Sequence, residues 1–223
     1  MGKRVGVLLS GCGVFDGTEI HEAVLTLLAI DRQGACAICT APNIKQLHVL
    51  NHLTNEEMDE TRNVLIESAR IARGRITDLE KLNAADLDAL IIPGGFGAAK
   101  NLSNFAVKGP DAKVHPEVQR ILTQMLASGK PIGAICIAPA TLTKALTEYA
   151  PEVTIGTDAG IAAAIDTMGG RHKNCQVDQI CVDSKQKIVT TPAYMLGPGI
   201  KEVAGGVEKL VAKVLALIDK PLT

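Results

Sequence analysis

Aromatic residues are scarce in this chain, which has three phenylalanines, two tyrosines and no tryptophan. Its core must therefore be aliphatic, and platforms on which nucleic-acid bases could stack are not expected. Net charge is small as well, −1 at pH 7, which argues against binding nucleic acid or an anionic membrane through bulk charge. No segment approaches the ~18 consecutive apolar residues that a membrane span needs. We therefore expect neither nucleic acid nor membrane as a partner.

The chain also lacks a disulfide framework. Its six cysteines follow no regular spacing, which indicates free thiols in a reducing compartment, and we expect a cytoplasmic protein. Cys36 and Cys39 resemble a redox or zinc pair. Residues three apart on a strand point to opposite faces, however, so we interpret them as two core thiols. His48 and His52 have no recognisable ligand spacing with the acidic residues near them, and no metal site is expected.

Hydrophobic residues make up 47% of the 223 residues and charged residues 21%, which is typical of a globular domain. Apolar runs predict strands over 4–10, 35–40, 87–92, 132–135, 153–155, 180–182 and 188–191. Helical spacing predicts helices over 18–33, 63–73, 115–129, from 138 onward and over 200–218, while 43–58 is ambiguous, with short strands around 47–50. Strands alternate with helices throughout. We predict one α/β domain over 1–223, a doubly wound, mostly parallel sheet with helices on both faces.

Cys136 lies where an apolar strand pattern changes to helical spacing, in Ile132-Gly-Ala-Ile-Cys-Ile-Ala-Pro139. A sharp turn between strand and helix lifts one side chain off the end of a sheet, the arrangement called a nucleophile elbow. The N–H groups and positive dipole end of the following helix lower the pKa of a thiol there. The sequence therefore predicts Cys136 as a nucleophile and as the thiol that alkylates first. The alternative is a small buried apolar residue.

Three glycine-bearing loops follow predicted strands, at 10–17, at 93–97 and at the elbow. Ligands of such sheets bind beyond the carboxyl ends of the strands, so we expect the loops to gather there. An oxyanion on a Cys136 adduct would be held by the N–H of Ile137 and by a second donor from Gly94 or Gly95. The alternative for these two glycines is an ordinary strand-ending turn.

The helix expected over 18–33 contains the candidate acid or base. Thr18 is a suitable N-cap, with Glu22 near the capping-box position. Glu19 and Glu22 are three residues apart and share a helix face with Thr26 and Ala29. The other side chains on this face are small, as a close approach of the helix to the sheet would require. The alternative is a solvated first turn in which Glu favours the helix dipole. The apolar face predicted for this helix comprises Ile20, Ala23, Val24, Leu27, Leu28 and Ile30.

The motifs around these loops resemble those of the PfpI/DJ-one superfamily, whose fold is flavodoxin-like and of class I glutamine amidotransferase type. The similarity lies in Pro93-Gly-Gly95, Gly97-Ala-Ala-Lys-Asn-Leu-Ser103 and Ala134-Ile-Cys-Ile-Ala-Pro139. The ElbB subgroup, also called enhancing lycopene biosynthesis protein, is more similar still. Its motifs match Ser10-Gly-Cys-Gly13, residues 16–26, Asn51-His-Leu-Thr54, residues 61–67 and Thr190-Thr-Pro-Ala-Tyr-Met195.

The resemblance implies Cys136 as the nucleophile and Glu22 as its carboxylate partner, with Glu19 as the second acidic position. It implies conversion of glyoxal to glycolate without glutathione or another cofactor, a protein deglycase activity claimed for relatives, and a homodimer. On this hypothesis the Cys136 thiolate forms a hemithioacetal whose oxyanion is held by Ile137 and Gly95. Glu22 then carries a proton through an enediol to a thioester, and water releases the product.

Other functions stay open at this point. Many superfamily members carry His directly after the nucleophile, and Ile137 in that place argues against a peptidase, which needs a Cys–His pair to protonate a leaving amine. A glutamine amidotransferase uses a later His-x-Glu. Here His115-Pro-Glu117 precedes the cysteine, and His172 is followed by Lys-Asn. A third class is a non-enzymatic redox sensor in which Cys136 is oxidised to a sulfinate.

Overall fold

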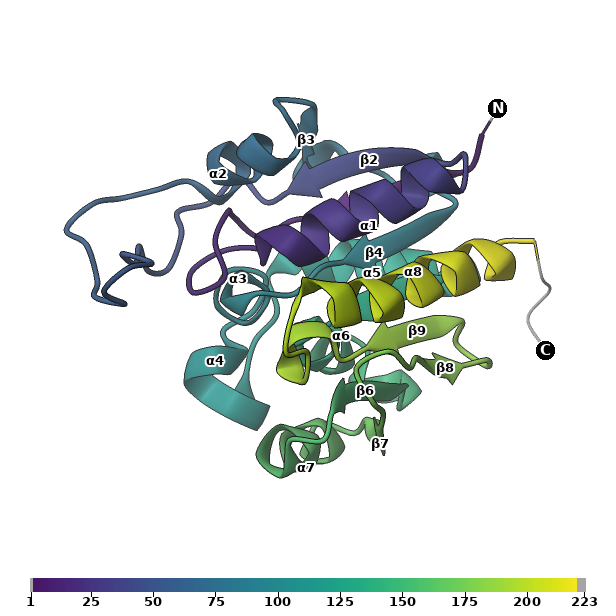
Figure 1. Cartoon of the computed structure of the whole chain (residues 1–223). Coiled ribbons are helices and arrows are strands. Elements are labelled where there is room, and N and C mark those ends of the chain that lie inside the picture. The colour runs from purple at the N-terminus through teal and green to yellow at the C-terminus, as the bar shows by residue number, and fades with distance from the viewer. Residues whose placement is uncertain (1, 220–223) are drawn as a thin grey trace.

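A seven-stranded sheet forms the centre of the structure, a computed structural model that describes residues 2–219 (Figure 1). The strand order is β3-β2-β1-β4-β5-β9-β8, and only the edge strand β8 is antiparallel to its neighbour. The predicted doubly wound, mostly parallel sheet is therefore confirmed. The strands are β1 (Arg4–Leu8), β2 (Cys36–Ala41), β3 (Ile76–Asp78), β4 (Ala89–Ile92), β5 (Ile132–Ile135), β8 (Cys181–Asp183) and β9 (Ile188–Thr191).

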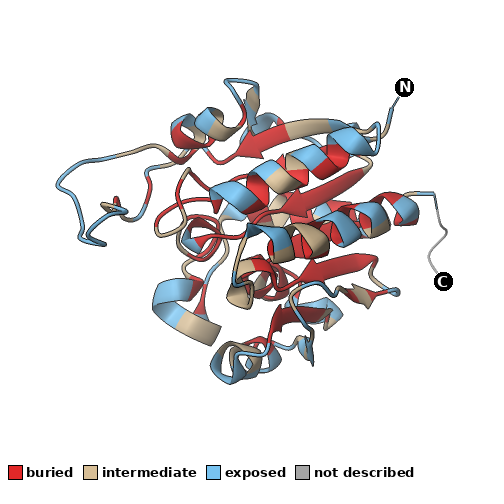
Figure 2. Ribbon diagram, viewed as in Figure 1, coloured by how far each residue is buried: buried red, intermediate tan, exposed pale blue. Residues whose placement is uncertain are grey.

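The central strands are buried on both faces (Figure 2). Every residue of β4, β5 and β9 is buried, and in β1 only Arg4 is exposed. Strands of a parallel sheet covered by helices on both sides consist of continuous apolar runs, because neither face meets water. This is why the apolar runs of the sequence located them.

Helices α1 (Ile20–Arg32) and α8 (Ile200–Leu217) pack side by side on one face of the sheet (Figure 1). On the other face lie α5 (Pro116–Ala127) and α6 (Ala138–Ala145). The buried face of α8 includes Val203, Val207, Leu210, Val211 and Val214, whereas Ile200 is 49% exposed. The remaining α-helices are α2 (Val64–Ile71), α3 (Phe96–Lys100), α4 (Phe105–Lys108) and α7 (Ala159–Thr167).

Two strands form a separate small sheet, which corrects the prediction of a single one. β6 (Glu152–Gly156) pairs in parallel with β7 (Arg171–Asn174) across α7. The N–H of Thr154 donates to the Thr190 hydroxyl at 2.8 Å, so a side chain takes the place of a backbone bond between β6 and β9. β7 is polar and mostly exposed, and its sequence Arg-His-Lys-Asn gives no strand signal. The sequence therefore predicts a loop around His172, whereas the structure places this residue in β7.

The first helix differs from its sequence prediction in both cap and apolar face. Thr18 is not the cap: its hydroxyl accepts from the N–H of Ser10 at 2.7 Å and holds the glycine-rich loop. Glu19 is the N-cap instead. Three residues of the predicted apolar face are exposed, while Thr26 and Ala29 are buried, as expected for the face that they share with Glu22. The exposed three are Ile20 (40%), Val24 (49%) and Leu28 (40%).

The ambiguous segment between β2 and α2 is a long excursion from the body of the molecule (Figure 1). The short strands expected around 47–50 do not form; isolated bridges join Lys45 to Asn63 and Leu50 to Glu57. The buried Asp16 carboxylate anchors the excursion by accepting from the N–H of Leu50 at 2.7 Å. The excursion is therefore tied to the glycine-rich loop after β1.

Candidate active site

The three glycine-bearing loops meet beyond the carboxyl ends of β1, β4 and β5, as expected. The N–H of Gly97 donates to the carbonyl of Gly17 at 2.8 Å, and the N–H of Glu19 donates to the carbonyl of Gly94 at 2.9 Å. Backbone therefore packs against backbone between the loop after β1 and the loop after β4. This close packing brings the N-terminus of α1 to the end of β5.

Cys136 occupies the predicted turn between strand and helix. β5 ends at Ile135, Ile137 is the N-cap of α6, and Cys136 between them has a φ of +62°. A residue with a side chain adopts this left-handed conformation at a cost, and such strain is concentrated at functional sites. The N–H of Cys136 donates to the carbonyl of Thr191 at 2.9 Å, which fixes the turn to β9.

The two N–H groups predicted to hold an oxyanion both donate to the Cys136 sulfur. They come from Gly95 and Ile137, one from each neighbouring loop. Gly94, the other predicted donor, has a different partner: its N–H donates to Oε2 of Glu22 at 2.9 Å. The sequence thus located the donor loops, while the structure assigns each N–H to its acceptor.

Glu22 is fully buried and hydrogen-bonded on both carboxyl oxygens. Oε2 accepts from Gly94, Oε1 accepts from the N–H of Tyr194 at 3.2 Å, and the Cys136 thiol donates to the same carboxyl group. Burial raises the pKa of Glu22 to about 8, and the nearby Glu19 carboxyl adds to the rise, while the three donors oppose it. A carboxyl group in contact with the thiol therefore titrates close to neutral pH.

The thiol pKa departs from the sequence prediction. Burial, followed by repulsion from the Glu22 carboxylate, raises the pKa of Cys136 well above its ordinary value. The N–H groups of Gly95 and Ile137 lower it, as a helix N-terminus should, but they do not prevail. The expectation of a lowered thiol pKa was therefore wrong. First alkylation of Cys136 stays a prediction, and its 7% exposure, against an exposed Cys36, argues against it. Once Glu22 is ionised, the remaining proton of the pair stays on sulfur and is donated to the carboxylate.

Glu19 contacts the site through the backbone of Glu22. Its Oε2 accepts from the N–H of Glu22 at 2.6 Å, so its carboxylate caps α1. Burial raises its pKa, and the N–H donors of the first turn of α1 oppose the rise. No hydrogen bond joins it to Cys136 within the described part of the chain. The structure therefore gives Glu22, and not Glu19, the contacts that a proton carrier requires.

Two residues beside Glu22 were not singled out from the sequence. Tyr194 lies in the short helix η5 (Ala193–Met195), and its N–H is one of the donors to Glu22. Its phenol oxygen is 2.7 Å from Nδ1 of His21, the residue before Glu22. The adjacency of His21 to Glu22 was visible in the sequence, but nothing there placed residues 21 and 194 together, because Tyr194 lies 173 positions after His21.

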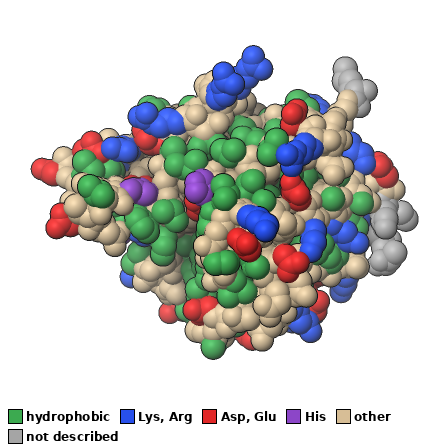
Figure 3. All heavy atoms as spheres, viewed as in Figure 1, with side chains coloured by type: hydrophobic (Ala, Val, Ile, Leu, Met, Phe, Trp, Pro, Cys, Tyr) green, Lys and Arg blue, Asp and Glu red, His purple; other side chains and the backbone are tan. Residues whose placement is uncertain are grey.

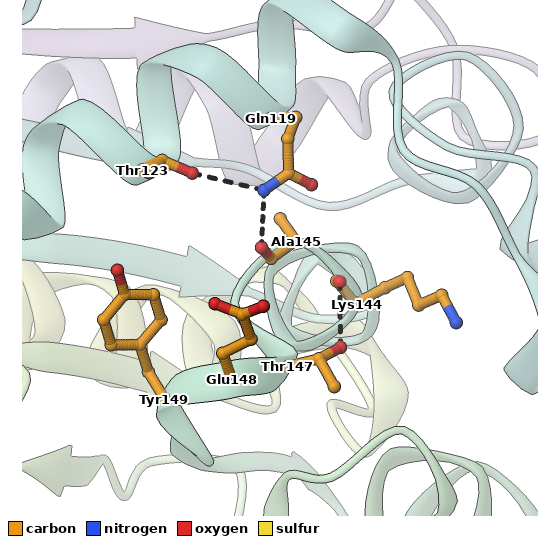
Figure 4. Close-up of a pocket in the computed structure, with 7 residues that line it drawn as sticks. All are labelled: Gln119, Thr123, Lys144, Ala145, Thr147, Glu148 and Tyr149. Carbon is orange, nitrogen blue, oxygen red and sulfur yellow. Dashed lines mark hydrogen bonds between the residues drawn. The ribbon is translucent and has the colours of Figure 1, made fainter.

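Other hollows of the molecule lie away from the thiol. A cavity of about 280 Å³ lies between α5, α6 and the short helix η4 (Thr147–Tyr149), with Gln119 bonded to the Ala145 carbonyl at 2.6 Å (Figure 4). A second cavity, of about 320 Å³, is lined in part by Phe15 and by Phe96, the residue that follows Gly95 in the sequence.

Over residues 2–219 no three His, Cys, Asp or Glu side chains gather as a metal site would require. In the same range no helix is both long enough and apolar enough to cross a membrane.

Known proteins resemble this chain in both sequence and fold. Residues 14–194 match the DJ-1/PfpI family. The chain is 49% identical over 227 aligned residues to the mitochondrial "glutamine amidotransferase-like class 1 domain-containing protein 3" of Homo sapiens, covering 97% of this chain and 84% of that protein. A crystal structure of an isoprenoid biosynthesis protein with amidotransferase-like domain from Ehrlichia chaffeensis superposes with a TM-score of 0.89 at 38% identity, covering 96% of this chain and 99% of that one.

The expected cytoplasmic location is contradicted by these relatives. The human protein is mitochondrial, and so is the ES1 protein homolog of Rattus norvegicus. The ES1 protein of Danio rerio, which is 36% identical and aligns over 86% of this chain and 77% of its own length, is mitochondrial as well. Free thiols indicate only that a compartment is reducing, and a composition of this kind does not say which one. The location drawn from cysteine usage was therefore wrong.

Proposed function

The chain belongs to the DJ-1/PfpI family, and on that premise we propose that it converts glyoxal to glycolate, with Cys136 as the nucleophile and Glu22 as the proton carrier. The observation that supports this most is the buried contact between the thiol and a carboxyl whose pKa is about 8. A group that titrates near neutral pH both takes up and releases a proton easily, which general acid–base catalysis requires.

The first step is addition of sulfur to one aldehyde carbon. The carbon–sulfur bond forms while the thiol proton passes to the Glu22 carboxylate, the acceptor of its hydrogen bond in the structure. The protonated carboxyl then returns this proton to the new alkoxide, which gives a neutral hemithioacetal. Because the acceptor is already in contact with the thiol, the high thiol pKa does not prevent the attack.

The second step moves a proton between the two carbons. Glu22 removes the C–H proton of the hemithioacetal carbon to give an enediolate and returns it to the neighbouring carbon, while the hydroxyl proton of the first carbon passes to the oxygen of the second. The first carbon becomes a thioester and the second a hydroxymethyl group. Water then cleaves the thioester, which restores the thiol and yields glycolic acid. One carbon is oxidised and the other reduced, so the overall reaction needs only glyoxal and water and no cofactor.

The N–H groups of Gly95 and Ile137 suit the charge that develops in these steps. In the structure they donate to sulfur. Negative charge moves from sulfur to the aldehyde oxygen as the adduct forms, and donors at this place stabilise the oxyanion without reorganisation. We assign them this role in the proposed mechanism.

Burial favours a small free aldehyde over one attached to a protein. Cys136 is 7% exposed and Ile137 is 8% exposed, so an adduct carried on a protein side chain has little access to the sulfur. Deglycation of proteins is therefore the less favoured activity of this site.

Two alternatives fit the geometry less well. Peroxide oxidises thiolates, and the raised pKa of Cys136 keeps the thiol protonated, which disfavours a redox sensor. A glutaminase needs a histidine to protonate the leaving amine, and in residues 2–219 no histidine is hydrogen-bonded to Cys136.

The proposal is tested by measuring glycolate formed from glyoxal with wild type, Cys136→Ala and the matched control Cys36→Ala. We expect turnover to vanish only in Cys136→Ala, since Cys36 is exposed on β2. Equal turnover by Cys136→Ala would overturn the assignment of the nucleophile. Absence of turnover in folded wild-type protein would overturn the proposed substrate.

A further inference from the structure

Tyr194 contacts the first turn of α1 twice. Its backbone N–H donates to Oε1 of Glu22 at 3.2 Å, and its phenol oxygen is 2.7 Å from Nδ1 of His21. The two rings lie 5.8 Å apart between centroids and are tilted by 47°. One residue of η5 therefore holds both the carboxyl at the centre of the site and the histidine beside it.

The backbone before Tyr194 is strained. Ala193 has a φ of +45°, a conformation that a residue with a Cβ seldom adopts. Its carbonyl accepts from the N–H of Leu196 at 3.1 Å and of Gly197 at 2.8 Å, which closes the turn between β9 and α8. A strained turn persists only where surrounding contacts hold it. On the α1 side, the hydrogen bonds of Tyr194 to Glu22 and His21 hold this turn.

From these contacts we propose that the hydrogen bond between His21 and Tyr194 positions the Tyr194 N–H on Glu22, so that both are positioning residues for the proton carrier. This inference rests on the proposed role of Glu22. Neither side chain is assigned contact with the substrate. Their function is to hold a strained turn where its N–H reaches one oxygen of a buried carboxyl.

The bond between the rings does not itself depend on the charge of His21. In neutral imidazole with the proton on Nε2, the phenol O–H donates to Nδ1. In the imidazolium form, Nδ1–H donates to the phenol oxygen, and the contact persists. The pair therefore positions Glu22 in either charge state of the imidazole.

Removing the bond should change the titration of the site. The groups that face Glu22 are the Glu19 carboxyl, the Cys136 thiol and the N–H groups of Gly94 and Tyr194. The Tyr194 donor lowers the pKa of Glu22, because it stabilises the carboxylate. When the turn relaxes and this donor withdraws, the pKa of Glu22 rises, and the reactive carboxylate form appears only at higher pH.

The experiment compares Tyr194→Phe, His21→Phe and the double variant with wild type. Tyr149→Phe is the matched control, since it removes the hydroxyl of the chain's other tyrosine, which is remote from Glu22 on η4. The pH dependence of Cys136 alkylation by iodoacetamide, mapped by mass spectrometry, reports the thiol–carboxyl pair without any substrate. Glyoxal turnover over the same pH range is the second measurement.

We expect both single variants to move the midpoint of the two profiles upward by about half to one pH unit, which corresponds to a roughly threefold to tenfold lower rate at pH 7. Turnover should return to the wild-type plateau at high pH. The double variant should shift no further than either single one, because both remove the same bond. Tyr149→Phe should leave the midpoint unchanged.

Unchanged midpoints in folded Tyr194→Phe and His21→Phe, checked by thermal unfolding, would overturn the inference. So would a uniform loss of rate at every pH, which indicates a merely structural role. If wild type does not turn over glyoxal, the proposed substrate fails, and the alkylation profiles still decide the role of His21 and Tyr194. The two failures are therefore distinguishable.

Discussion

A thiol and a carboxyl share a buried hydrogen bond at Cys136 and Glu22, and burial raises the pKa of both. Their order of ionisation decides the chemistry. The carboxyl has the lower pKa, about 8, and accepts the bond, so the first proton lost leaves a carboxylate beside a thiol. In the proposed mechanism the pair therefore works as a base with its nucleophile in contact, and not as a preformed thiolate.

This order predicts how turnover depends on pH. Glu22 must be ionised to accept the thiol proton, so kcat/KM for glyoxal should rise by about tenfold per pH unit below pH 8 and level off above it. The rates should be measured from pH 6 to 9.5, with the background of Cys136→Ala subtracted. A rate that is flat or falls between pH 6 and 8 would contradict this order.

The same carboxyl should make stability fall with pH. In the folded state Glu22 keeps its proton up to about pH 8, whereas in the unfolded chain it ionises near 4.5. The folded state thus binds one more proton between pH 5 and 8, and unfolding free energy falls there by about 1 kcal/mol per pH unit. Glu22→Gln cannot ionise and should lose this slope.

Thermal unfolding of wild type and Glu22→Gln from pH 5 to 9 provides the measurement. The amide has one acceptor oxygen for two N–H donors, which adds a constant offset of about 1–3 kcal/mol against the variant. The difference should nevertheless move in favour of the variant up to pH 8 and stay constant above. Parallel curves would show that Glu22 has an ordinary pKa.

At the scale of the element, the loop after β4 brings its backbone into close contact with the thiol and the carboxyl. A Cβ at Gly94 would overlap the Cβ of Cys136 and Oε2 of Glu22. Gly94→Ala should therefore separate thiol from carboxyl, lower turnover at least about a hundredfold and cost about 1–3 kcal/mol of stability. Gly160→Ala on α7 is the control, because a Cβ there meets only Asp158 Oδ1, at an ordinary contact distance of 3.4 Å.

Glycolate formation and chemical unfolding of the two variants decide this point. Gly160→Ala should be neutral or stabilised by up to about 1 kcal/mol, because alanine favours the helix. Wild-type turnover in Gly94→Ala would show that the thiol and the carboxyl need not touch.

Elements that one local pattern specifies could be predicted from the sequence. The apolar runs located the buried strands, and the change of period at Cys136 located the elbow. The cap of α1 could not be predicted, because Thr18 bonds to Ser10, a partner brought close only by the folded loop. The thiol pKa was wrong for a similar reason: the dipole of α6 is local, whereas burial and Glu22 act through tertiary structure.

At the scale of the molecule, the exposed apolar stripe on α1 is a feature that the monomer leaves unexplained. Figure 3 shows hydrophobic side chains gathered over this helix. Ile20, Val24 and Leu28 recur every four residues on one face and are each at least 40% exposed. We propose that a second copy covers them, in keeping with the homodimer that the family resemblance implied.

Light scattering after size exclusion tests this proposal. Wild type should elute with twice the mass of the 23.4 kDa chain, and Val24→Glu should elute as a monomer. Val107→Glu is the control, since Val107 is 57% exposed on α4, away from the stripe. A monomeric wild type at micromolar concentration, or a dimeric Val24→Glu, would contradict the proposal.

The central claim is that Glu22 carries the proton for a Cys136 nucleophile, and the initial rate of glycolate formation from glyoxal at pH 8 tests it most directly. Glu22→Gln should be slower than wild type by about two to four orders of magnitude, the usual span for general acid–base catalysis. Glu19→Gln keeps a capping oxygen for the Glu22 N–H and should lose much less. Near-wild-type turnover by Glu22→Gln would contradict the account, and a dead Glu19→Gln beside an active Glu22→Gln would assign the proton to the other carboxylate.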